Sequence, residues 1–152
     1  MVNFHDNTGD LRGEFALRVF KRGKLIYAYA DHNLIVNSGR ERLAELAAGL
    51  SSKFITQLGV GTGVSTEAED DTQLENQQLF ALTNATTDGR DAKFDFVITP
   101  EQANGLKITE FALFCADNTM FSHRVRKTQS GEVRGIEKEN DIQIEGYWVI
   151  HF

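Results

Sequence analysis

The sequence contains little cysteine and proline and has no long apolar run. Of its 152 residues, only Cys115 is a cysteine and only Pro100 is a proline. A single cysteine excludes a disulfide within the chain, and its apolar neighbours predict a buried thiol. No stretch approaches the ~20 apolar residues of a membrane-spanning helix, and residues 1–10 are too polar for a secretion signal. We therefore expect a chain made in a reducing cytoplasm and not inserted into a membrane.

Basic residues are outnumbered as well. The chain has 16 Lys and Arg against 22 Asp and Glu, which gives a formal net charge of −6. This charge opposes a phosphate backbone, so nucleic acid is not an expected partner. Phenylalanine, in contrast, is abundant, with 11 residues against 3 Tyr and 1 Trp. Large apolar side chains without a polar tip favour a sheet interior.

Most of the chain shows the short, partly alternating apolar segments that are typical of β-strands. Several of these segments are bounded by Gly, Asn, Asp or Pro, the residues that favour turns. We predict strands at residues 15–20, 25–30, 54–60, 78–83, 92–99, 106–115, 120–125 and 142–152. In the last of them Trp148 and Phe152 share the apolar face, so we expect the final residue to belong to the core.

One helix interrupts this pattern. Ser38 and Glu41 have the spacing of a capping box, and an apolar stripe follows, which predicts a helix over about residues 38–49. The fold class expected is mainly β: an antiparallel β-sandwich or partly open barrel with one short helix packed on it. Residues 1–12 are expected to form a flexible arm, and residues 13–152 a single β-rich domain.

Six residues between these elements need a structural explanation. The glycines Gly59, Gly61 and Gly63 permit a sharp turn or the close approach of another backbone. Asp71 can cap a turn, and the Leu74 side chain can enter the core where the loop returns to it. Glu110 shares a strand face with Ala112 and Phe114, so burial of that face would require donors for its carboxylate, such as backbone N–H groups of a neighbouring loop. Holding that loop is the favoured role for Glu110, over an assembly contact or catalysis.

Several short segments form an ordered set along the chain: residues 33–36 (Asn-Leu-Ile-Val), 58–63 (Leu-Gly-Val-Gly-Thr-Gly), 71–76 (Asp-Thr-Gln-Leu-Glu-Asn), 109–114 (Thr-Glu-Phe-Ala-Leu-Phe) and 120–121 (Met-Phe). In this order they resemble structural proteins of bacteriophage tails. The resemblance implies a non-catalytic structural or adaptor component of a virion tail, made in the host cytoplasm, that joins fibre, collar or baseplate parts. It also implies other tail proteins as partners and a homo-oligomer, a trimer or a hexamer.

No pattern indicates a catalytic site or a cofactor. The Gly59 to Gly63 string lacks the Gly-Lys-Ser or Gly-Lys-Thr ending of a phosphate-binding loop. Glu69, Asp70 and Asp71 are weak candidates for calcium, because hard cations take several carboxylate oxygens, but their spacing differs from an EF-hand and a solvated loop is favoured. The four histidines lie too far apart to indicate zinc, and we expect them at the surface or packed among strands: His5, His32, His123 and His151.

Two sets of residues are candidates for an interface. Arg124, Arg126 and Lys127 are basic, whereas residues 67–71 are acidic, so one copy could dock head to tail on the next; scattered solvated charges are the alternative. Trp148 could contribute to an interface too. A carbohydrate- or receptor-binding module of a tail fibre, with a host surface glycan as ligand, is the rival function. Its candidate aromatic residues are Tyr27, Tyr29, Tyr147 and Trp148.

Overall fold

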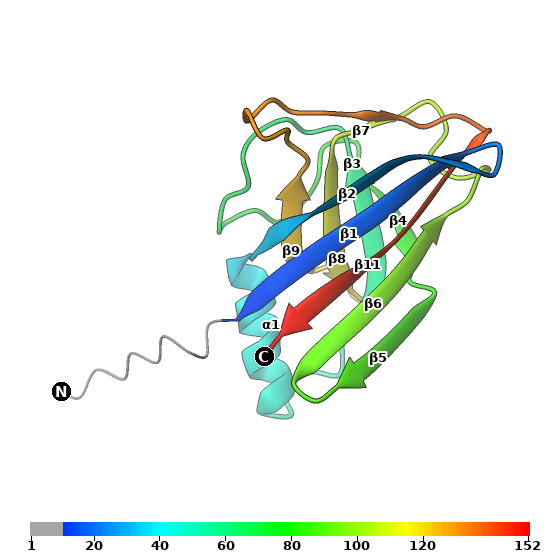
Figure 1. Ribbon diagram of the computed structural model, residues 1–152. Coiled ribbons are helices and arrows are strands. Elements are labelled where there is room, and N and C mark those ends of the chain that lie inside the picture. Colours follow the sequence, from blue (N-terminus) through cyan, green and yellow to red (C-terminus); the bar gives the residue numbers. More distant parts are fainter. Residues whose placement is uncertain (1–10) are drawn as a thin grey trace.

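The computed structural model describes residues 11–152, which form a curled antiparallel sheet with one short helix (Figure 1). The first half of the chain contains β1 (Arg12–Lys21), β2 (Lys24–Ile35), α1 (Asn37–Ala47), β3 (Ile55–Gly61), β4 (Gln78–Ala81) and β5 (Asn84–Asp88). The second half contains β6 (Asp91–Ile98), β7 (Lys107–Ile108), β8 (Glu110–Cys115), β9 (Met120–Val125), β10 (Ile136–Glu137) and β11 (Ile142–His151). The prediction of a mainly β fold, in the form of a partly open barrel with one short helix, is confirmed.

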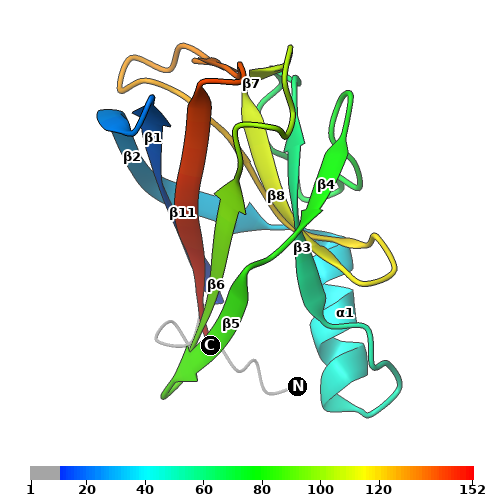
Figure 2. The same cartoon turned by 90° about the vertical axis from the view of Figure 1, so that its right-hand side faces the viewer.

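Nine strands make up the curled sheet, in the order β4-β3-β8-β9-β2-β1-β11-β6-β5, and β7 pairs separately with β10. The two edge strands, β4 and β5, follow each other in the chain and meet at residues 82–83. There the N–H of Leu82 donates to the carbonyl of Thr56 on β3, the neighbour of β4. The N–H of Thr83 donates to the carbonyl of Asp95 on β6, the neighbour of β5. Beyond this point β5 diverges from β3 and leaves the barrel open toward α1 (Figure 2).

The main core lies inside the curl and is filled by alternate residues of the strands. In the central row of the sheet, Phe15 on β1 pairs with Trp148 on β11, which in turn pairs with Phe94 on β6. The Phe15 ring lies 4.8 Å from the Trp148 ring and 5.0 Å from the Phe111 ring of β8, centroid to centroid. Aromatic pairs at these separations add about 0.5–1.5 kcal/mol each beyond the burial of their area.

Strand β8 is buried on both faces along its whole length. Phe111 and Leu113 point into the main core, whereas Ala112 and Phe114 belong to a second cluster that also contains Leu74. The loop that follows β3 therefore packs over the outer face of β8. We call residues 61–75 the covering loop. Glu110 lies on this covered outer face, which determines the candidate site described below.

The helix is held by tertiary contacts instead of a capping box. Val36 is the N-cap and no side chain caps the first turn, so the predicted pairing of Ser38 with Glu41 is wrong. The Ser38 hydroxyl donates instead to the carbonyl of Met120 on β9, at 2.6 Å. Arg42 is buried and donates two hydrogen bonds, of 3.0 and 2.7 Å, to the carboxylate of Asp117. These contacts attach α1 to β9 and to the turn before it.

Three further expectations about the ends and edges of the sheet need correction or restriction. Strand β11 ends at His151, and Phe152 is 44% exposed, so the last residue is not a core residue. Strand β5 was not predicted because its five residues are all exposed and lack apolar alternation. Of the predicted arm, residues 1–10 lie outside the described residues, and β1 already begins at Arg12. Within residues 11–152, no helix has the length and apolar character needed to cross a membrane.

Candidate functional site

A buried histidine between two carboxylates lies under the loop that covers β8. Glu110 on β8 and His123 on β9 project from the same outer face, because Ala112, two residues after Glu110, pairs directly with His123. The His123 Nε2 lies 2.8 Å from Glu110 Oε1, and its Nδ1 lies 2.7 Å from Asp71 Oδ2. We refer to Asp71, Glu110 and His123 as the His123 cluster.

The second oxygen of the Glu110 carboxylate binds the covering loop directly. Glu110 Oε2 accepts hydrogen bonds from the backbone N–H groups of Gly63, at 2.6 Å, and Glu75, at 3.0 Å. These are the backbone donors that were expected for a buried carboxylate at this position. The neighbouring Thr109 donates its hydroxyl to the carbonyl of Gly63, at 2.5 Å. The two residues fix both ends of the covering loop to the start of β8.

The electrostatics of the His123 cluster favour a charged imidazole. Burial disfavours the charged form of His123, but the hydrogen bonds and charges of Glu110 and Asp71 outweigh it and raise the pKa of His123 above its usual value. An imidazolium donates through both ring nitrogens, which matches two acceptors on opposite sides of the ring. One positive charge thus bridges two negative groups that would otherwise repel each other.

The glycines of the motif permit this close packing. A Cβ atom added at Gly63 would lie 2.3 Å from Glu110 Oε2, and one at Gly59 would lie 2.4 Å from a ring carbon of Phe114. Neither glycine has a positive φ angle, so space, and not backbone conformation, requires glycine here. Leu74 is buried in the second cluster, as predicted for a loop that returns to the core. Gly59, Gly63, Leu74 and Glu110, which are distant in the sequence, thus lie together in the structure.

The chemistry of the His123 cluster is that of a structural clamp. Both ring nitrogens of His123 are engaged by carboxylates, so neither is free to activate a nucleophile or a water molecule. Among residues 11–152 no group of three or more His, Cys, Asp and Glu side chains could hold a metal ion. Asp71 turns toward His123 and the N–H of Ala68, whereas Glu69 and Asp70 are exposed. The three calcium candidates therefore do not converge.

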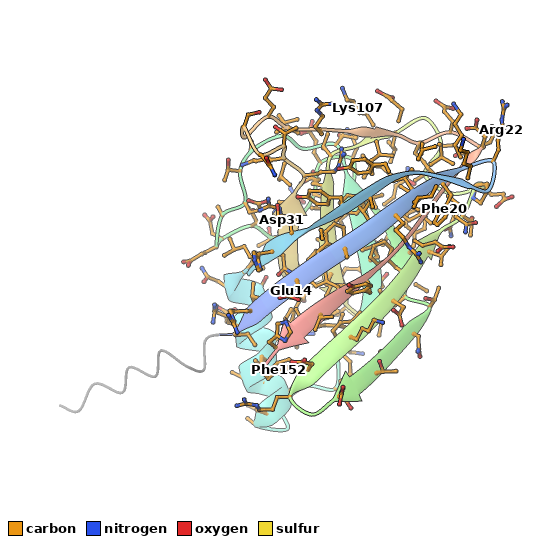
Figure 3. All side chains as sticks on the ribbon, viewed as in Figure 1. Glu14, Phe20, Arg22, Asp31, Lys107 and Phe152 are labelled. Atoms are coloured by element: carbon orange, nitrogen blue, oxygen red, sulfur yellow. The ribbon has the colours of Figure 1, made fainter. Side chains whose placement is uncertain are left out.

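The basic candidates contact residues of their own chain, and the predicted head-to-tail docking between copies stays a prediction. Arg124 forms ion pairs with Asp31 (labelled in Figure 3) and, at 3.6 Å, with Glu67. Lys127 donates to the hydroxyl of Thr66 at 2.8 Å. Arg126 is buried, and its guanidinium lies over the Tyr27 ring. Arg124 is thus paired within its own molecule, because the covering loop folds back onto β9 and the residues that follow it.

Trp148, another predicted interface residue, is not available for contact with a partner. It is fully buried, because β11 lies between β1 and β6 and the Trp148 side chain points into the curl. Tyr27 and Tyr29 also point inward and are partly buried. Tyr147 alone of the four candidate aromatic residues is exposed; it lines a shallow hollow of about 780 Å³ on the outer face of the sheet, beside Ala16 and Gly146.

A feature that the sequence did not reveal is an apolar groove at the open side of the barrel. This groove, of about 760 Å³, lies between α1, the start of β3, and strands β5 and β6; we call it the seam groove. Its lining includes Leu43, Leu46, Phe54, Ala85, Phe94 and Phe152. Phe54 is 61% exposed, and Leu50, just beyond α1, is 80% exposed. An apolar stripe at residues 43–50 was visible in the sequence, but its position beside β5, the last strand of the described sheet, was not.

Comparisons with known proteins add no assignment. No family model matches the chain, and neither a curated protein nor a solved structure is significantly similar to it.

Proposed function

We propose that the chain is a non-catalytic structural or adaptor component of a bacteriophage tail or a phage-like tail. In this proposal it forms a homo-oligomer, a trimer or a hexamer, and joins fibre, collar or baseplate parts of the virion. The resemblance of the ordered motifs supports this assignment. The geometry adds that three of these segments, residues 58–63, 71–76 and 109–114, meet at the buried His123 cluster, whose histidine has both ring nitrogens engaged.

The observation that carries the proposal is the seam groove with its exposed apolar rim. Phe54, Phe152 and Leu50 all expose large apolar surface near the α1 end of the barrel. Large apolar patches of this kind mark interaction sites, because water-exposed apolar area is unfavourable unless a partner covers it. Among residues 11–152, β5 also ends the sheet beside the groove, so none of these residues pairs with the backbone groups of its outer edge. We infer that other subunits of the tail cover this region.

Sedimentation velocity of the full-length protein over a range of concentrations tests the proposal. We expect a species with the mass of a trimer or a hexamer, and a shift toward smaller species in a Phe54→Ser, Leu50→Ser variant. Lys53→Ser, next to Phe54 and also exposed, is the matched control and should leave the mass unchanged. A strict monomer at the highest attainable concentration would contradict the proposal.

A second candidate function, binding of a host surface glycan, rests on Tyr147 alone. Its ring is exposed beside the outer hollow, and the Lys93 ammonium lies 4.8 Å from the ring centroid. Aromatic rings beside polar groups can stack against sugars, so saturable glycan binding that is lost in Tyr147→Ala would support this alternative. The Tyr147→Ala variant must remain folded for this test. We expect it to fold, because the Tyr147 side chain lies outside the core.

A further inference from the structure

We propose that the tip of the β1–β2 hairpin docks on the covering loop of a second copy of the chain. Residues 21–26 form this tip, and we call them the hairpin tip. The inference rests on the proposed homo-oligomer and adds to the seam groove a contact that joins subunits head to tail. Opposite charges, exposed apolar side chains and the distance between the two surfaces support it.

The hairpin tip carries an excess of positive charge. Lys21, Arg22 (labelled in Figure 3) and Lys24 are exposed, and residues 21–26 contain no acidic residue. The carboxylate of Asp141 lies 3.9 Å from the Lys21 ammonium and 3.6 Å from the Arg22 guanidinium. One carboxylate shared by two of the three cations does not neutralise the tip. In a chain with a formal net charge of −6, such a surface attracts the acidic parts of other copies.

The covering loop has the opposite charge. It contains five acidic residues and no Lys or Arg. Two of them, Glu67 and Asp71, are engaged by basic side chains of the same molecule. The other three acids are exposed: Glu69, Asp70 and Glu75. Contacts between two tips or between two covering loops would bring like charges together, so the charges favour the pairing of a tip with a loop.

Both surfaces also expose apolar side chains beside their charges. Leu25 and Ile26 of the hairpin tip are 49% and 52% exposed, and Val64 of the covering loop is 61% exposed. Removal of apolar area from water favours association, whereas complementary charges mainly set the orientation and the rate of binding. A contact between the two surfaces would supply both contributions.

The distance between the two surfaces prevents this contact within one molecule. The covering loop is attached to His123, which pairs with Leu34 near the end of β2, whereas Lys24 begins β2 at the hairpin tip. The strand from Lys24 to Leu34 spans about 33 Å. Figure 1 accordingly shows the hairpin tip on one side of the molecule and the covering loop, in green, on the other. Surfaces on opposite sides join copies head to tail, and such contacts close into a ring when the rotation between subunits permits it.

Charge reversal on each surface, followed by mixing, tests this inference in the full-length protein. The tip variant is Arg22→Glu, Lys24→Glu, and the loop variant is Glu69→Lys, Asp70→Lys. Each variant alone brings like charges together. We therefore expect the concentration at which half of the protein is assembled, measured by sedimentation velocity, to rise at least about tenfold. In an equimolar mixture the two variants can alternate with opposite charges at every contact. Native mass spectrometry should then show oligomers with equal numbers of both variants.

A matched control separates this contact from the effect of net charge. Arg40→Glu, Arg90→Glu changes the net charge by the same amount as the tip variant, and both residues are exposed and lie outside the two surfaces. This control should assemble like the wild type. The substituted side chains are all exposed, so each variant should fold, and unchanged fluorescence of the buried Trp148 verifies this.

The outcomes separate this inference from the proposed function. Assembly of the tip and loop variants at the same concentration as the wild type would overturn the inference and leave the proposed homo-oligomer intact. Loss of assembly in both variants without recovery in the mixture would also overturn it, as would an equal loss in the control. A wild type that remains a strict monomer would contradict both proposals.

Discussion

Replacement of His123 by Leu removes the cationic member of the His123 cluster while keeping a side chain of similar size. Glu110 would then remain buried with only the N–H groups of Gly63 and Glu75 as donors. A hydrogen bond to a buried charge contributes about 1.5–3 kcal/mol, and the pair with the partly exposed Asp71 adds about 0.5–1 kcal/mol. We therefore expect His123→Leu to lower the free energy of unfolding by about 3 kcal/mol, near the ~3–5 kcal/mol found for breaking buried ion pairs.

Urea denaturation followed by tryptophan fluorescence measures this loss. Trp148 is the only tryptophan and is fully buried, so its emission reports exposure of the core. Glu110→Gln provides the matched partner for a double-mutant cycle. Because Gln removes the buried charge that His123→Leu leaves uncompensated, the double variant should be less destabilised than the sum of the single variants, by about 1–3 kcal/mol.

The same variant should change the pH dependence of stability. The pKa of His123 is raised in the folded protein, so its contribution is fully present below the unfolded pKa of about 6.5 and is lost as pH rises through the folded pKa. The difference in unfolding free energy between the wild type and His123→Leu should therefore shrink as pH rises above about 6.5. The pKa of His151 is also raised, mainly by its hydrogen bond to Asp91, but His151 is present in both proteins and cancels in the difference. A loss below 1 kcal/mol, or a difference independent of pH, would refute the clamp.

Three further predictions concern the core and the motif glycines. Trp148→Ala should cost about 3–5 kcal/mol in urea denaturation followed by far-UV circular dichroism, since this variant has no tryptophan, whereas Tyr147→Ala, on the outer face, should cost less than about 1 kcal/mol; similar losses would contradict the burial of Trp148. Gly63→Ala should destabilise by about 1–3 kcal/mol, since its Cβ would overlap the Glu110 carboxylate, and loop 61–75 should become more sensitive to proteolysis; a neutral effect would refute the close contact. Burial raises the pKa of the Cys115 thiol to about 11, so a thiol reagent at pH 8 should react only after unfolding; rapid reaction of the native protein would contradict this.

The strands that the sequence predicted best are those with one buried face. In β1, Phe15 and Leu17 alternate with exposed or half-buried residues, and the same pattern holds in β6 and β11. Period-two burial is a local property, so one segment suffices to recognise it. β5 lacks this signal because it lies at the sheet edge with all residues exposed. Its position depends on β6 and on the turn at residues 82–83, which no local pattern records.

Polar residues whose partners are distant in the chain could not be assigned from the sequence. Ser38 has the spacing of a helix cap but bonds to Met120, which is 82 positions away. Lys138 is fully buried and donates to three oxygens, two of them on Pro100 and Asn104. The sequence identified Glu110 as a residue that needs donors, but not His123 as its partner. That pairing depends on the register of β8 with β9, which shifts at Leu113 and Phe114.

The covering loop explains why these distant residues belong to one structural unit. A strand buried on both faces needs a second layer, and here residues 61–75 supply it over the outer face of β8. A covering loop brings polar backbone groups with it, and each of these needs a partner once water is excluded. Glu110 satisfies two of them, His123 balances the charge of Glu110, and Gly63 leaves room for the carboxylate. The same interaction network that stabilises this side of the barrel buries the side chains of Glu110 and His123, which is why the proposed contacts with other subunits are placed at the seam groove and at exposed side chains and not at these two.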